Sequence, residues 1–325
     1  MNRDELIGAL YASIGETCVA EPNIAHIEIH GNEVLGVHLV PGLEVEAEEF
    51  SDRIEVKMTV EKDHQINQPV RICFGLLDPN GSQQIDMHIR LEQNSRVAVL
   101  ASCTFPNAVD VFHGMDAVIE LGKGAEYIYL ERHVHGPEGG VEVIPKAKVY
   151  LDEGAKFRTD FELVKGAVGK IDIDYEAECQ RDSILDMIAR ISGRGDDKIA
   201  INEKAHLLGE GAHGVLRTNI AVKDRASATI KNTLVASAPG ARGHVDCKEI
   251  VQDEAFANAI PIVEVKHPKA HVTHEASIGS VDSKQLETLM CRGLTEDQAT
   301  ELIIQGLLNP RGGDSSQGRW WTAPS

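Results

Sequence analysis

The sequence predicts a mainly β protein that is built as a repetitive solenoid. Over long stretches apolar residues alternate with charged or hydroxyl residues, which is the period of a half-buried strand; one example is Ile54, Val56, Met58 and Val60. Aromatic residues make up only 4% of the chain, and glycines number 29. A large β protein with so few aromatic side chains must fill its core with stacked aliphatic layers, which favours a solenoid over a sandwich.

A repeat along the chain supports stacked rungs. Three stretches can be superimposed at a constant interval, with Leu91, Leu121 and Leu151 in equivalent positions, and a fainter copy places Val222 where Leu121 stands. Regular repetition of this kind is typical of units that cover one another's apolar faces. A meander of hairpins with matched turns gives the same spacing, so both architectures stay open at this point.

Composition limits the classes of partner. The formal net charge of -19 argues against nucleic acid or an anionic membrane as the main partner, because both are bound through clustered Lys and Arg. The sequence contains no run of about 18 apolar residues that could span a membrane. Asp4 and Glu5 stand where a secretory signal would be basic and then apolar. We therefore expect a cytoplasmic protein.

The N-terminal segment, residues 1–22, is predicted to contain one short helix. Leu6, Leu10 and Ile14 are four residues apart, and Asn2 is in position to cap the helix. The period then changes to two, so residues 23–281 are predicted to form the β core.

Residues 282–310 are predicted to form a helical hairpin. The first helix should end at Gly293, and the second should open with Thr295 and Gln298 in capping-box spacing. Each helix has an apolar stripe that must pack either on the β core or on another protein: Leu286, Leu289 and Met290 in the first, and Ala299, Leu302, Ile303 and Leu307 in the second. The tail, residues 311–325, contains Trp320 and Trp321 and is expected to be disordered.

The stretch from His267 to Asp282 contains three histidines and a glutamate within nine positions. It lacks the second histidine of an H-E-x-x-H zinc motif, and Pro268 favours a strand over a helix. On a strand, His274 faces the opposite side from His271 and Glu275. Since the apolar residues before it, Ile260 and Ile262, have even numbers, His274 is predicted to be an inward, partly desolvated imidazole. Such a histidine is more often a hydrogen-bonded core residue than a metal ligand.

The same alternation selects two cysteines. Cys103 continues the apolar face of the strand before it into the core, and Cys247 shares its face with Val245 and Glu249. A buried Glu249 needs a metal ion or a proton to balance its charge. The six cysteines contain no C-x-x-C pair, and scattered thiols are usually small buried residues.

Signatures of two enzyme classes are missing from the sequence. It has no GxxxxGK[ST] phosphate loop, so the chain is not expected to hydrolyse ATP itself. The low aromatic content argues against a carbohydrate-cleaving β-helix, which would place paired acids in an aromatic-lined groove.

Residues 241–308 resemble the C-terminal core of the SufB/SufD family, the scaffold subunits of the SUF iron-sulfur cluster assembly machinery. The resemblance is carried by IPIVEV, HEASIGSVD, QLETLMCRGLTEDQA and IIQGLL, which occur in the family's order and spacing. It extends more loosely over the β-rich region from about residue 80, and it is strongest to the short single-scaffold form found in archaea and some bacteria.

The resemblance implies a right-handed parallel β-helix core, between the short N-terminal helix and the C-terminal helical hairpin. It implies that the terminal helices bind SufC, an ABC-type ATPase, and that two scaffold chains pair as a homodimer through the C-terminal part of their β-helices in a 2:2 complex. A sulfur donor and apo acceptor proteins are further implied partners. His274 and Glu275 match the family's interface histidine and glutamate.

One position departs from the family pattern. SufB subunits of two-scaffold systems carry a cysteine where this chain has Ala255. Choosing substitutes by their environment, we expect Cys103, Cys247, His274 and Glu275 to be metal ligands for a transient iron-sulfur cluster at or near the homodimer interface. The alternative is a purely structural adaptor, similar to SufD, that binds SufC and a second scaffold without holding a cluster.

Overall fold

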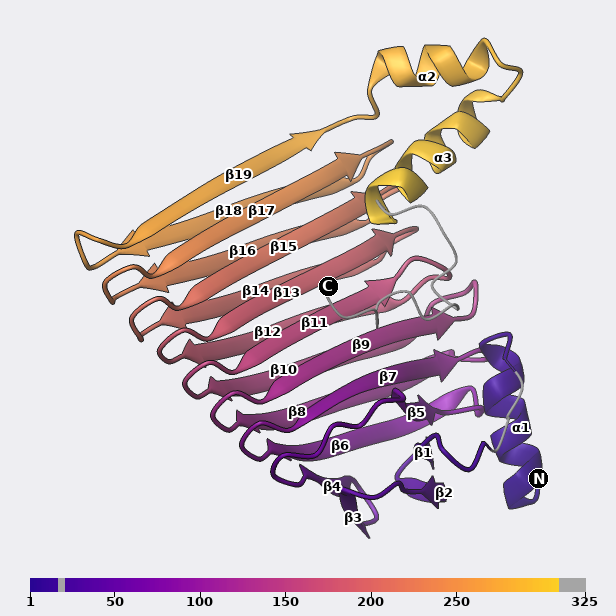
Figure 1. Ribbon diagram of the computed structural model, residues 1–325. Coiled ribbons are helices and arrows are strands. Elements are labelled where there is room, and N and C mark those ends of the chain that lie inside the picture. Colours follow the sequence, from indigo (N-terminus) through magenta and orange to yellow (C-terminus); the bar gives the residue numbers. More distant parts are fainter. Residues whose placement is uncertain (17–20, 310–325) are drawn as a thin grey trace.

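The computed structural model describes residues 1–16 and 21–309, which form a β-helix of about eight turns with helices at both ends (Figure 1). The chain alternates between two long sheets, so that each turn contributes one strand to each sheet. This confirms the solenoid and excludes the meander of hairpins. The predicted tail, with Trp320 and Trp321, lies outside the described residues.

The first sheet has ten strands. In spatial order from the C-terminal end they are β19 (His271–Gly279), β17 (Arg242–Val251), β15 (His213–Val222), β13 (Ile184–Gly193), β11 (Lys156–Leu163), β9 (Glu126–His135), β7 (Arg96–Phe105), β5 (Val70–Gly75), β1 (His26–His30) and β2 (Glu33–His38). Neighbouring strands are parallel except β1 and β2.

The second sheet has nine strands. In the same direction they are β18 (Phe256–Val265), β16 (Ser227–Ala236), β14 (Lys198–Leu207), β12 (Gly169–Cys179), β10 (Val141–Leu151), β8 (Asp110–Leu121), β6 (Asn80–Leu91), β4 (Ile54–Val60) and β3 (Leu43–Glu49). Here the antiparallel pair is β3 and β4.

The register explains the repeat seen in the sequence. Leu91, Leu121 and Leu151 lie directly beside one another on β6, β8 and β10. The fainter copy at Val222 is wrong, because Val222 ends β15 in the other sheet, beside Gly193 and Val251. Every turn of the β-helix has two corners of similar composition, and the sequence pattern alone did not separate them.

The core fills the space between the two sheets. Alternate residues of each strand point inward, and the apolar ones form one continuous cluster from Ala25 to Cys247. All four residues of the alternating stretch at Ile54 to Val60 are buried in this cluster. Stacked Val, Ile, Leu and Ala layers therefore supply the burial that aromatic side chains supply in other β proteins.

The terminal helices follow the predicted capping signals. Helix α1 (Arg3–Ser13) has Asn2 as its N-cap, within a capping box. Helix α2 (Ser283–Met290) is followed by α3 (Glu296–Leu308), which opens with the predicted box of Thr295 and Gln298. No helix among the described residues is long and apolar enough to cross a membrane.

The predicted apolar stripe of α3 is partly wrong. The residues that α3 buries are Ala299, Ile304 and Leu308, the last two packing with Ala221, while Leu302 is 48% exposed. Ile304 and Leu308 are one helical turn apart, so the face they share is the one that meets β13 and β15. Leu302 is two positions from Ile304 along the helix, so it points away from this face and is exposed.

Candidate functional sites in the β-helix

Two groups of buried polar side chains interrupt the apolar interior. The middle cluster consists of Cys103, His113, Glu131 and His133, and the C-terminal cluster consists of Glu203, Thr218, Asn232, Cys247 and Glu249. Placing polar groups inside a β-helix is unfavourable unless they are hydrogen-bonded or bind a ligand, so both groups require an explanation.

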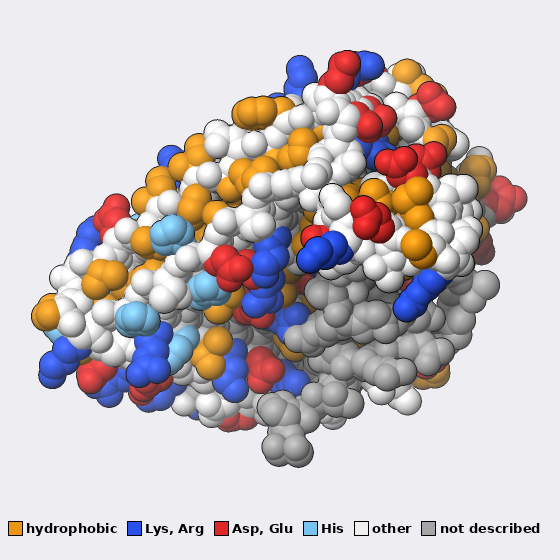
Figure 2. Space-filling model, turned by 90° about the horizontal axis from the view of Figure 1, so that it is seen from above, with side chains coloured by type: hydrophobic (Ala, Val, Ile, Leu, Met, Phe, Trp, Pro, Cys, Tyr) orange, Lys and Arg blue, Asp and Glu red, His pale blue; other side chains and the backbone are white. Residues whose placement is uncertain are grey.

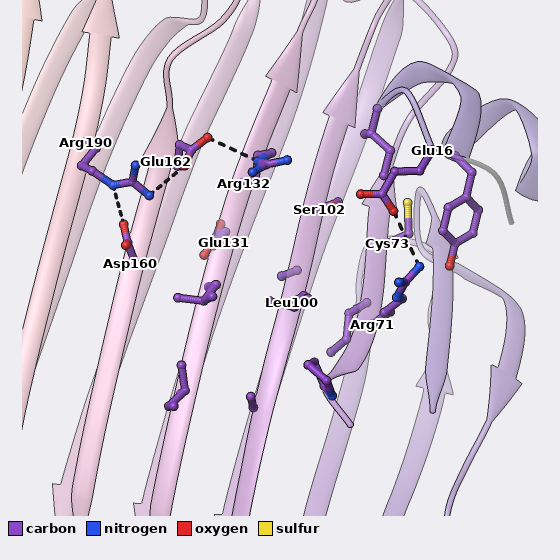
Figure 3. Close-up of a pocket in the computed structure, with 18 residues that line it drawn as sticks. Glu16, Arg71, Cys73, Leu100, Ser102, Glu131, Arg132, Asp160, Glu162 and Arg190 are labelled. Atoms are coloured by element: carbon purple, nitrogen blue, oxygen red, sulfur yellow. Dashed lines mark hydrogen bonds and ion pairs between the residues drawn. The ribbon is translucent and has the colours of Figure 1, made fainter. Parts of the chain in front are cut away.

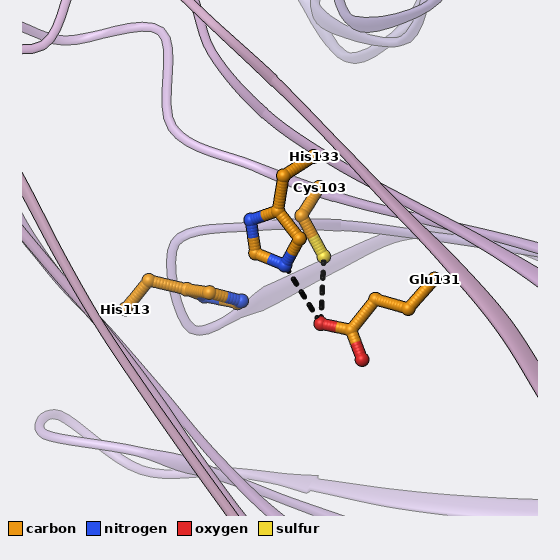
Figure 4. Close-up of side chains that lie close together, drawn as sticks. All are labelled: Cys103, His113, Glu131 and His133. Atoms are coloured by element: carbon orange, nitrogen blue, oxygen red, sulfur yellow. Dashed lines mark hydrogen bonds and ion pairs between the residues drawn. The ribbon is translucent and has the colours of Figure 1, made fainter. Parts of the chain in front are cut away.

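The middle cluster is formed by three consecutive strands (Figure 4). Cys103 comes from β7, His113 from β8, and Glu131 and His133 from β9. The Nε2 atom of His133 lies 2.8 Å from Oε1 of Glu131, and the sulfur of Cys103 lies 3.8 Å from the same oxygen. One potential ligand atom from each residue falls within 4.8 Å of the others.

Burial sets the charge of the middle cluster. It raises the pKa of the Cys103 thiol and of the Glu131 carboxyl, and it lowers the pKa values of His113 and His133 to about 3. Both imidazoles are therefore neutral at physiological pH, which is the form that binds metals.

The C-terminal cluster confirms the faces predicted for Cys247 and Glu249, both of which are buried on β17. Cys247 lies beside Thr218 of β15, and Asn232 of β16 donates through Nδ2 to its sulfur at 3.7 Å. Among the described residues, neither carboxylate oxygen of Glu249 has a hydrogen-bond partner. Glu203 of β14 is beside Asn232 in the second sheet.

Burial again dominates the ionisation of this cluster. It raises the pKa of Glu203 to about 8, that of Glu249 to about 7 and that of Cys247 to about 11. Cys247 is thus a thiol at neutral pH, and it becomes a thiolate ligand only when a cation or solvent reaches it.

His274 and Glu275 lie on β19, after which no further strand follows among the described residues. His274 is beside the buried Val245 of β17, so its side chain is directed to the interior side, whereas Glu275 is beside Asp246. The predicted desolvation of His274 is wrong: the residue is exposed, because no described strand stacks on the last rung.

Ile260 and Ile262 lie on a different strand from His274, so their parity does not give its direction. Ile260 and Ile262 belong to β18, where they are beside Lys231 and Thr233 and point outward. A turn separates β18 from β19, so the numbering of one strand does not carry over to the next. The register of β19 itself gives the inward direction of His274.

A second group of potential metal ligands lies on the outer face of the first sheet. It consists of His244, Asp246 and Glu275, whose ligand atoms lie within 4.8 Å of one another. His244 is hydrogen-bonded to the Thr273 hydroxyl at 2.8 Å, and Asp246 lies 3.0 Å from the Lys248 ammonium. Two of these three side chains, His244 and Asp246, therefore already have a protein partner.

The structure brings three of the four predicted ligands near one another. Cys247, His274 and Glu275 are on the adjacent strands β17 and β19. Cys103 on β7 is five inter-strand steps from β17, or about 24 Å.

The other members of both clusters, including His113, Glu131, His133 and Glu203, were not predicted from the sequence. The stretch EYIYLERHVH offered the signal, since Tyr127, Tyr129, Glu131, His133 and His135 alternate with outward residues, and all five are buried.

A groove on the outer face of the first sheet runs between α1 and β13 (Figure 3). Its charged residues are paired with one another. Arg190 lies 2.8 Å from Asp160 and 2.7 Å from Glu162, and Arg132 lies 3.3 Å from Glu162. Arg190 also donates to the Leu308 carbonyl at 3.1 Å. This network fastens the end of α3 to the β-helix.

The C-terminal end of the β-helix is apolar and uncovered. Figure 2 looks onto this end and shows a band of hydrophobic side chains across it. The exposed large apolar residues of β18 and β19 are Phe256 (59%), Ile260 (38%), Val265 (51%) and Ile278 (48%). Val265 and Ile278 lie beside the inward residues Ala236 and Glu249, so the core itself is open here.

Comparison with known proteins identifies the relatives of this chain. Residues 76–307 match the family model described as SUF system FeS cluster assembly, SufBD core domain. The chain is 39% identical over 282 residues to an iron-sulfur cluster assembly SufBD family protein of Methanocaldococcus jannaschii, covering 87% of each chain. It is 32% identical over 305 residues to another of Pyrococcus horikoshii, covering 94% and 93%. The iron-sulfur cluster assembly protein SufB of Bacillus subtilis is 24% identical over 261 residues, which are 77% of this chain and 54% of SufB.

Proposed function

The chain belongs to the SufBD family of iron-sulfur cluster assembly proteins, and from this premise we propose that it is a scaffold subunit on which a transient cluster is built at the open end of the β-helix. One observation carries this proposal. A buried thiol, Cys247, lies one strand from the exposed and inward-directed His274, at the end of the core where β19 is the last described strand.

The donor atoms at this end suit a cluster that must leave again. Thiolate sulfur is the usual ligand of iron-sulfur clusters, whereas imidazole and carboxylate bind iron more weakly and exchange more readily. We place the nascent cluster on Cys247 and His274, which both face the interior side. Glu275 faces the outer side of β19, and we propose it as a further ligand from the rim of the paired interface.

A second copy of the chain is the proposed cover of the open end. Phe256, Val265 and Ile278 expose apolar surface that is unfavourable in water. Pairing two chains end to end about a two-fold axis would bury this surface and would bring two sets of ligands together at one interface.

Helices α2 and α3 together form the proposed docking site of a SufC-like ABC-type ATPase. The ATPase, not this chain, would hydrolyse the ATP. Ile304 and Leu308 anchor α3 on the β-helix, while Met290 and Leu302 remain exposed for a partner. Since Arg190 connects the end of α3 to β11 and β13, movement of the helices under the ATPase would pull on the β-helix near the C-terminal cluster. Such a movement would open the route to Cys247.

Anaerobic reconstitution of the complex of the chain and its ATPase tests this proposal. With ferrous iron, sulfide and ATP, the natural chain should bind iron and sulfide and show cluster absorbance, and Cys247→Ser should lose most of it. The matched control is Cys179→Ser, since Cys179 is equally buried on β12 but lies outside both clusters. An unchanged spectrum in Cys247→Ser removes Cys247 from the site.

The same experiment decides the alternative function. If the natural chain and its ATPase form a complex but bind neither iron nor sulfide, the chain is a structural adaptor. Such a result would leave the open end as a pairing surface only.

A further inference from the structure

The middle cluster takes no part in the proposed assembly site. It lies about 24 Å from Cys247, and strands of both sheets continue on either side of it. Aromatic rings enclose it: Phe161 lies 4.7 Å from the ring of His133, and Phe105 lies 4.9 Å from the ring of His113, between centroids. This cluster is therefore a closed site, unlike the end of the β-helix.

A chain of hydrogen bonds fixes the tautomer of His133. The carbonyl oxygen of Ala167 can only accept, so Nδ1 of His135, 3.3 Å away, carries a proton. Nε2 of the neutral His135 then accepts from Nδ1 of His133 at 3.2 Å. With Nδ1 of His133 as the donor to His135, its Nε2 is the ring nitrogen that faces Oε1 of Glu131, 2.8 Å away.

Two acceptors cannot face each other at this distance without something between them. Either a shared proton or a metal cation must lie between the carboxyl group and Nε2 of His133. A backbone carbonyl that orients one ring nitrogen so that the other can bind a metal is the usual outer shell of a metal site.

Further unsatisfied atoms point to a cation. Within the described part of the chain, Oε2 of Glu131 and Nδ1 of His113 are buried without a hydrogen-bond partner. The sulfur of Cys103 completes a set of one thiolate, one carboxylate and two imidazoles, which is a donor set that divalent zinc and ferrous ions accept.

We propose that Cys103, His113, Glu131 and His133 bind one divalent transition-metal ion of the zinc or ferrous class inside the β-helix. The charges balance: the ion displaces one proton from the thiol and one from the carboxyl, so two negative ligands meet two positive charges. A neutral complex is the form that a buried apolar site tolerates best. The ion ties β7 and β9 of the first sheet to β8 of the second.

Growth in cobalt-supplemented minimal medium tests the proposal, because the ion is then present while the chain folds around the site. Full-length protein, purified in air without iron or sulfide, should contain one cobalt per chain. It should also show tetrahedral ligand-field bands and a thiolate-to-cobalt charge-transfer band. Cys103→Ser should lose the charge-transfer band, and Glu131→Gln should lower the cobalt content several-fold.

The control variants separate this site from the assembly site. Cys179→Ser and Cys247→Ser should keep the cobalt content and both kinds of band. Natural protein without bound cobalt overturns the proposal, and so does a charge-transfer band that survives in Cys103→Ser. Neither result bears on the iron-sulfur cluster, which is measured with other reagents.

Discussion

The middle and C-terminal clusters lie in the same interior, yet they differ in what covers them. Cys103 and Cys247 are equally buried in the single chain. In the first sheet, however, six strands follow β7 towards the C-terminal end, and only β19 follows β17. A repetitive fold opens most easily at its ends, because each rung is held only by its neighbours. If both proposals hold, position along the β-helix separates a site that retains its ligand from a site that can release one.

The strongest test of this difference compares a central core residue with an end residue. Phe161→Ala should lower the free energy of unfolding by about 3–5 kcal/mol, because the ring is 2% exposed and packs on the ring of His133 in the interior. Ile278→Ala on β19 should change it by about 0.5 kcal/mol or less in the monomer. Urea denaturation measures both, and equal effects would show that the end rung is as tightly packed as the centre.

The link between the β-helix and α3 should give the next largest effect. Arg190→Ala leaves Asp160 and Glu162 without their shared guanidinium, and a loss of about 2–3 kcal/mol is expected from a largely buried pair. Hydrogen exchange should show faster opening of α3 than of β7. Arg225→Ala, which removes an exposed pair with Asp196, is the control and should change neither measurement. Unchanged exchange of α3 in Arg190→Ala would contradict the link.

The C-terminal cluster should make stability depend on pH. Burial raises the pKa of Glu203 to about 8, so the folded chain holds a proton that the unfolded chain releases above its ordinary value of 4.5. The contribution to stability therefore falls as pH rises through this window, by about 1–2 kcal/mol between pH 6 and 8. Glu203→Gln should remove this part of the slope. Melting temperatures measured between pH 6 and 8 check this. If they change with pH equally in the natural chain and in Glu203→Gln, Glu203 is not desolvated.

The sequence was sufficient to predict the repeating fold, since alternation and the leucine interval follow directly from stacked strands. It also placed Cys103, Cys247 and Glu249 on the inward face, because parity within one strand is reliable. It could not show that His274 is exposed, since exposure depends on being in the last rung rather than on the face. It also could not join His113 to His133, because these residues come from different sheets and meet only across the interior.

A crossed comparison of Cys103→Ser and Cys247→Ser tests the central claim most directly. Both variants, each with the ATPase, would be reconstituted anaerobically with iron and sulfide and measured for cluster absorbance. The division between a closed and an open site predicts that Cys247→Ser loses the cluster while Cys103→Ser keeps it. Loss of the cluster in Cys103→Ser, with Cys247→Ser unaffected, would contradict the assignment of assembly to the open end.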